Sequence, residues 1–169
     1  DQTYDVIMVD AYQDITIPFQ MSSAEFFTLV REHLKEDGVM VVNMNMRGTE
    51  EGNINQYLAD TICDAFSHVY TVDVEYSTNR ELFASNVPGM TERLQAGMEE
   101  LEPELAGMME EVQAGLTAYE AGPYKMTDDR APVELLGMQV IDDLIGEEVE
   151  YYKAIYQEDG IGGLLDVLG

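Results

Sequence analysis

Apolar residues follow two kinds of spacing along this chain, one typical of buried strands and one of amphipathic helices. Residues 4–10 (YDVIMVD) and 38–46 (GVMVVNMNM) are short, nearly continuous apolar runs, the pattern of strands covered on both faces. Between them, residues 22–35 begin with two serines that can cap a helix and carry apolar residues at helical spacing. The order strand, helix, strand predicts a βαβ unit with a right-handed crossover.

The predicted sheet extends to about residue 86. Residues 53–66 have the spacing of a further helix, and residues 69–76 (VYTVDVEY) and 81–85 (ELFAS) are predicted strands. The chain up to residue 86 is therefore predicted to be a βαβαββ half-sheet.

Residues 87–169 are predicted to be mainly helical. Apolar residues recur every three or four positions over 90–116, and a break just before Pro103 should leave two segments there. A last helix is expected over 132–157, followed by a tail that docks or frays. With the half-sheet, this extension is expected to form one partial domain, residues 1–169.

Composition narrows the class of protein. The 169 residues are 46% hydrophobic, so the chain can bury a core. It contains neither an apolar run of about 18 residues nor the basic-then-apolar layout of a signal peptide, and we expect a globular, cytoplasmic protein. One cysteine and two histidines supply no ligand set for structural zinc, so no metal site is expected.

The charge balance is strongly acidic. The 34 Asp and Glu residues outnumber the 8 Lys and Arg residues, which gives a formal net charge of −26. Such a field repels phosphate backbones, which argues against a nucleic-acid partner, and it attracts cationic small molecules. Most of these carboxylates are expected to form a solvated surface, so the charge is compatible with a polycationic substrate without demonstrating one.

Candidate chemistry lies where the predicted strands end. Ligands of open α/β sheets bind beyond the carboxyl ends of the strands, which is where Asp10 and Tyr12 fall. Asp10 is the leading candidate, and its alternative role is a helix cap or a turn. Asp14 either shares a cationic ligand with Asp10 or is a solvated loop residue. Asn43 and Asn45 either bind a ligand or simply close the second strand, and closure is favoured.

For the segment TDDRAPVE a structural role is favoured. Asp128 and Asp129 can brace the turn that leads into the last helix, and Arg130 can pair locally. GIGG, residues 160–163, has no strand before it and is discarded as a nucleotide-binding loop.

Four segments carry a family resemblance. YDVIMVDAY, IPFQMSSAEFFTLVREHLKEDGVMVVNM, NRELFASN and MTDDRAPVE resemble successive blocks of the spermidine synthase-like (aminopropyltransferase) family, particularly a branch often fused to membrane transporter segments. The family has the class I S-adenosylmethionine-dependent methyltransferase fold. The resemblance implies an α/β chain that is the C-terminal half of a Rossmann-like methyltransferase fold, with about four strands, mostly parallel, and additional C-terminal helices.

The resemblance also implies roles for residues. The family's catalytic aspartate ends its fourth strand, and this position is Asp10. A second acid in the same loop contacts the diamine in that family; Asp14 matches it only approximately, because the loop here reads DAYQDITIP rather than D-x-x-D followed by Gly-Pro. Tyr12 falls at the same edge as a substrate-binding candidate, and Tyr124 is a loose match to a tyrosine of the amine pocket.

The implied reaction moves an aminopropyl group from decarboxylated S-adenosylmethionine to a diamine, in polyamine biosynthesis. No prosthetic group is implied, because the nucleoside is a co-substrate. The family's glycine-rich nucleoside loop follows its first strand, and no G-x-G loop after a strand occurs in these 169 residues. We therefore expect the isolated chain to be inactive, with a missing N-terminal half of the same protein as its partner, and we also consider a homodimer. The alternatives are a methyltransferase with an unknown acceptor and a non-catalytic relative that binds a ligand or partner.

Overall fold

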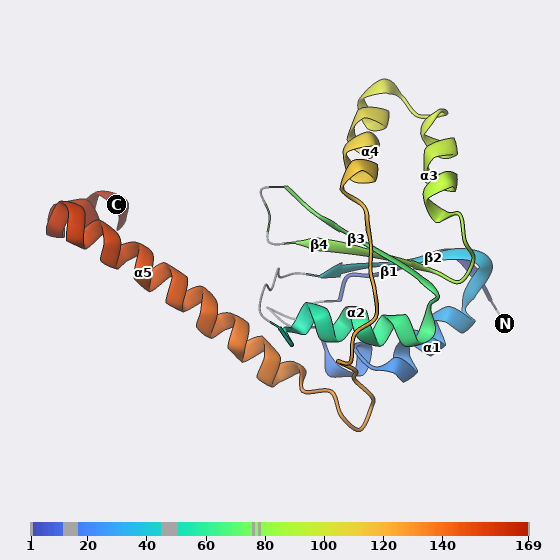
Figure 1. Ribbon diagram of the computed structural model, residues 1–169, viewed down its shortest axis with the longest axis horizontal. Coiled ribbons are helices and arrows are strands. Elements are labelled where there is room, and N and C mark those ends of the chain that lie inside the picture. The colour runs from blue at the N-terminus through green and yellow to red at the C-terminus, as the bar shows by residue number, and fades with distance from the viewer. Residues whose placement is uncertain (1, 12–16, 45–50, 76, 78, 169) are drawn as a thin grey trace.

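The computed structural model describes residues 2–11, 17–44, 51–75, 77 and 79–168. A five-stranded sheet forms the centre, with α1 and α2 against one face and α3 and α4 on the other, while α5 extends away from the body (Figure 1). In chain order the elements are β1 (Tyr4–Val9), the 3₁₀ turn η1 (Phe19–Met21), α1 (Ala24–Glu32), β2 (Leu34–Met44), α2 (Ile54–Ala65), β3 (His68–Asp73), β4 (Arg80–Ser85), α3 (Met90–Met98), α4 (Pro103–Gly115), β5 (Thr117–Ala118) and α5 (Val133–Leu168).

The sheet has the strand order β1-β2-β4-β3-β5, and its pairing is mixed. β1 and β2 are parallel, whereas β2–β4, β3–β4 and β3–β5 are antiparallel. The α/β class is confirmed, but the expectation of mostly parallel pairing is wrong. The physical reason is the short connection between β3 and β4, which makes an antiparallel hairpin and places β4 between β2 and β3.

The core lies between the sheet and the α1–α2 layer. From Gly38 to the end of β2 every second residue is buried, with Met40, Val42 and Met44 at 1% exposure or less. These side chains pack with residues of both helices, among them Phe27 of α1 and Leu58 of α2. The period of two in β2 fixes which residues face this core and which face the α3–α4 layer.

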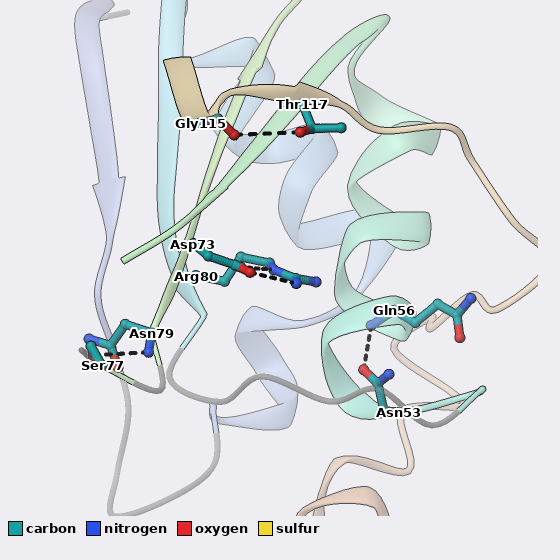
Figure 2. A network of polar contacts seen from close by, with 8 residues as sticks. All are labelled: Asn53, Gln56, Asp73, Ser77, Asn79, Arg80, Gly115 and Thr117. Carbon is teal, nitrogen blue, oxygen red and sulfur yellow. Dashed lines mark hydrogen bonds and ion pairs between the residues drawn. The ribbon is translucent and has the colours of Figure 1, made fainter. Parts of the chain in front are cut away.

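Side-chain caps start both core helices at the predicted places. Ser23 accepts a hydrogen bond from the backbone N–H of Phe26 at the start of α1. Asn53 does the same for Gln56 at the start of α2, over 3.0 Å (Figure 2). Each cap satisfies an N–H group that has no partner within its helix.

The C-terminal helices break close to the predicted places. Pro103 occupies the first turn of α4, after the end of α3 at Met98, so the predicted break is confirmed. The helical geometry of α5 is interrupted at Gly160, close to the predicted end at Gln157, by a φ of 66° that glycine adopts easily. The tail beyond this kink forms a second helical segment, which extends to Leu168. None of the helices in the described ranges is long and apolar enough to cross a membrane.

Candidate active site

Three polar side chains form a row across neighbouring strands at the end of β1. Asp10 directly follows β1, Asn43 lies in β2 and Glu81 lies in β4. Val9 is the register partner of Val42, so Asp10 comes beside Asn43, and Asn43 is itself the partner of Glu81. This group, Asp10–Asn43–Glu81, is called the polar row below.

The polar row lies on the sheet face that carries α3 and α4. Side chains alternate between the two faces of a sheet, so Asn43 shares a face with Val41 and Glu81 shares one with Phe83. Val41 and Phe83 line an apolar cavity of about 320 Å³ beneath α3 and α4. The polar row therefore borders this apolar cavity on the side of the carboxyl end of β1.

Asn43 holds the carboxylate of Asp10. Its Nδ2 donates a hydrogen bond to Oδ1 of Asp10 over 3.2 Å, and Asp10 is otherwise exposed to solvent. Oδ1 of Asn43 is buried and has no hydrogen-bond partner within the described ranges. Buried amide oxygens nearly always accept a hydrogen bond, so this atom offers an acceptor to a donor that approaches Asp10.

Glu81 is a partly buried carboxyl group that forms no ion pair with the described residues. Burial, and after it the negative charge of Asp10, raises the pKa of Glu81 above its ordinary value. The adjacent Arg80 is engaged elsewhere: its Nε lies 2.6 Å from Oδ1 of Asp73 on the neighbouring strand β3 (Figure 2). The polar row therefore combines two carboxyl groups with an unsatisfied acceptor, and this combination favours a bound ammonium group.

The other predicted site residues have different outcomes. Tyr12, Asp14 and Asn45 lie outside the described residues. Tyr124 packs at the start of α2, where its ring centroid lies 5.0 Å from that of Tyr57 and its hydroxyl donates to Glu51 over 3.0 Å. No hydrogen bond or ring contact joins Tyr124 to Asp10 in the described part of the chain, and its place in an amine pocket stays a prediction.

One buried acid was not singled out in the sequence. Asp60 of α2 is fully buried and accepts three hydrogen bonds, from the hydroxyl of Tyr119 and from the backbone N–H groups of Gly122 and Tyr124, at 2.7–2.9 Å. Burial and the contact with Asp60 raise the pKa of Tyr119 well above its usual range. Asp60 thus ties the segment before α5 to α2. The sequence signal that could have indicated it is an aspartate within the mostly apolar run LADTIC, residues 58–63.

Asp128 of the TDDRAPVE segment has the structural role that the sequence predicts, whereas no side-chain contact of Asp129 or Arg130 with the described residues tests theirs. Ser23, the cap of α1, donates to Oδ1 of Asp128 over 2.5 Å, and the backbone N–H of Asp128 donates to Glu25. Thr127 and Arg130 exchange two backbone hydrogen bonds that close the turn. Asp128 therefore attaches this turn to the start of α1. Within the described ranges, no three His, Cys, Asp or Glu side chains are grouped so as to hold a metal ion.

Comparisons with known proteins agree with these features. The sequence model of the spermine/spermidine synthase domain matches residues 1–87, which include all of the polar row. A probable polyamine aminopropyl transferase of Bifidobacterium longum is 48% identical over 185 residues, an alignment that covers 96% of this chain. The chain belongs to the spermine/spermidine synthase family.

Two solved structures show weaker likenesses. A probable spermidine synthase from Corynebacterium glutamicum has a TM-score of 0.45 at 18% identity, and it covers 72% of this chain and 48% of its own. Human methyltransferase-like protein 13, in complex with SAH, has a TM-score of 0.47 at 20% identity, with 70% and 52% covered. The family assignment rests on the two sequence comparisons. The chain spans 40% of the length of the Bifidobacterium protein.

Proposed function

We propose that the protein containing this chain transfers an aminopropyl group from decarboxylated S-adenosylmethionine to a diamine, with Asp10 as the general base. The observation that carries this proposal is the position of Asp10. It follows β1 inside the region matched by the synthase domain, and Asn43 orients its carboxylate by a hydrogen bond of 3.2 Å. Its solvent-exposed side lies open to an incoming amine.

The reaction is a displacement at carbon. The lone pair of the amine nitrogen attacks the carbon bonded to the sulfonium, the carbon–sulfur bond breaks, and its electron pair stays on sulfur as the neutral thioether methylthioadenosine. A new carbon–nitrogen bond forms, and the nitrogen gives its extra proton to Asp10. The products are the longer polyamine, methylthioadenosine and a protonated carboxyl group that returns its proton to water.

Asp10 has two physical tasks in this reaction. A primary ammonium group titrates near 10.4 in water, so only a small fraction is the nucleophilic free amine at neutral pH. A carboxylate attracts the amine, points its lone pair toward the carbon and takes up the proton as the bond forms. General-base assistance of this kind contributes roughly 10² to 10⁴ in rate.

The remaining groups are part of the same proposal. The nucleoside is a co-substrate, no prosthetic group is required, and residues outside this chain supply the nucleoside loop. Tyr12, Asp14 and Tyr124 are proposed to line the amine site. A cytoplasmic location and a homodimer are proposed for the complete protein, and the net acidity of this chain supports a cationic substrate over a nucleic acid.

The test is an assay of the complete reading frame that encodes this chain. Putrescine and decarboxylated S-adenosylmethionine should give spermidine and methylthioadenosine, measured by mass spectrometry. Methyl transfer from intact S-adenosylmethionine to an acceptor would instead assign a methyltransferase. Failure of both reactions, with a folded protein, would make the chain part of a non-catalytic relative.

A further inference from the structure

We propose that Glu81 binds the second, non-reacting ammonium group of a diamine acceptor whose reacting nitrogen is held by Asp10. This inference rests on the proposed function, and it makes Glu81 the residue that distinguishes diamines from monoamines. Glu81 is a specificity-determining residue in this scheme and takes no part in the proton transfer.

The sheet sets the geometry. Asp10 and Glu81 belong to β1 and β4, which flank β2, and the register places both beside Asn43. Adjacent strands lie about 4.8 Å apart, so the two backbones are about 10 Å apart at this point. Both side chains are on the same face, and they extend from the two ends of the row toward a ligand that lies over Asn43. A short alkyl chain with an ammonium group at each end suits this separation.

The residues between the two acids fit the middle of such a ligand. Val41 and Phe83 occupy the next positions along β2 and β4 on this face, where they provide apolar contact for methylene groups. Oδ1 of Asn43 is the buried acceptor without a partner in the described ranges, and an ammonium group brings three N–H donors. The row has an acid at each end and an amide with apolar neighbours in the middle. This arrangement matches a diamine, which has an ammonium group at each end and methylene groups between them.

The charges around Glu81 favour the same reading. A carboxylate that is partly removed from water is costly unless a cation accompanies it. Arg80 points to the other face by strand alternation and is paired with Asp73, and Glu81 forms no ion pair with the described residues. Burial and the charge of Asp10 raise the pKa of Glu81, which agrees with a partly buried carboxyl group that has no cationic partner among the described residues.

Steady-state kinetics of the complete protein test the inference. The acceptors are putrescine and n-butylamine, which share a four-carbon chain and differ only in the second amine. The variants are Glu81→Gln and, as a control with the same change of net charge, Glu36→Gln, whose exposed side chain lies near the other end of β2. Glu81→Gln should raise KM for putrescine about tenfold or more, as expected for a lost hydrogen-bonded charge, and leave KM for n-butylamine unchanged. Glu36→Gln should change neither KM by more than about twofold.

The outcomes separate this inference from the proposed function. If Glu81→Gln and Glu36→Gln raise KM for putrescine equally, the effect is general attraction of cations, and the role of Glu81 is wrong. An equal rise of KM for both amines with Glu81→Gln would also overturn it. If Asp10→Asn abolishes transfer while Glu81→Gln leaves the preference for putrescine intact, the proposed function stands and only the inference fails. If the unsubstituted protein transfers no aminopropyl group, both fail together.

Discussion

Nδ2 of Asn43 lies 3.2 Å from Oδ1 of Asp10 and joins the end of β1 to the neighbouring strand β2. This hydrogen bond turns one carboxylate oxygen toward the sheet and leaves the exposed part of the side chain free for an amine. The register partner of Asn43 in β4 is Glu81, so the amide side chain lies between two acids. Asp10 is exposed, whereas Glu81 is partly buried.

Asp10→Asn should lower the rate of aminopropyl transfer by about 10² to 10⁴, because the amide cannot accept the proton from the attacking amine. The fold should persist, since the side chain is exposed and lies outside the core. The measurement is kcat with putrescine, together with circular dichroism. Asp5→Asn is the matched control, because Asp5 is an exposed acid of β1 that pairs with Lys35. Activity of Asp10→Asn equal to that of the control would exclude Asp10 as the base.

Asp60→Ala should lower the free energy of unfolding by about 3 kcal/mol or more. The substitution leaves three donors without an acceptor, the hydroxyl of Tyr119 and the backbone N–H groups of Gly122 and Tyr124. Urea unfolding followed by circular dichroism measures the change. The same substitution one turn later in α2, Asp64→Ala, removes a surface ion pair with Lys125 and should cost less than about 1 kcal/mol. Equal losses in the two variants would show that the buried network does not stabilise the chain.

Most of the helices and strands can be predicted from local sequence patterns, and so can the leading site residue, Asp10. Pro103 ends one helical segment and starts another because it lacks an N–H group, and its effect needs no tertiary information. The capping residues Ser23 and Asn53 are equally local. Asp10 was found because an aspartate after a buried strand lies at the edge where α/β sheets bind ligands.

What could not be predicted depends on residues distant in sequence. The placement of β4 between β2 and β3 decides which side chain stands beside Asn43, and no periodicity shows the order of strands. Glu81 therefore went unnoticed although its strand was predicted. The two-residue strand β5 is too short for a pattern and forms only because β3 offers it a free edge. Asp60 meets its partners about sixty residues further along the chain.

Cys63 should react slowly with iodoacetamide in the native chain. Burial, followed by the negative charges of Asp60 and Asp64, raises the pKa of its thiol from 9.0 to about 11. Only the thiolate reacts, and a rise of two pKa units lowers the thiolate fraction at pH 8 by about 100-fold. The rate at pH 8 should therefore be about 100-fold lower than in the urea-unfolded chain, as measured by mass spectrometry. Asp64→Asn should react faster than the unsubstituted chain, and a native rate equal to the unfolded rate would contradict the prediction.

Glu81→Gln should stabilise the chain at neutral pH and have little effect at acidic pH. Burial and the charge of Asp10 raise the folded pKa of Glu81 above 4.5, so its ionisation opposes folding. Below the unfolded pKa both states hold the proton, and the two proteins should unfold at similar temperatures. As pH rises from there through the folded pKa, the unfolded state releases its proton first and the unsubstituted chain loses stability.

The measurement is the difference in Tm between Glu81→Gln and the unsubstituted chain from pH 4 to pH 7. It should start near zero, grow in favour of Glu81→Gln, and level off once Glu81 is ionised in both states. Glu36→Gln should show no such pH dependence, because its side chain is exposed. Putrescine that binds at the polar row should reduce the difference at pH 7, since a bound ammonium group compensates the charge of Glu81 and stabilises the unsubstituted chain more than Glu81→Gln. A difference in Tm that is independent of pH would mean that ionisation of Glu81 does not destabilise the folded chain. The description of Glu81 as a partly buried acid that favours a bound cation would then be wrong.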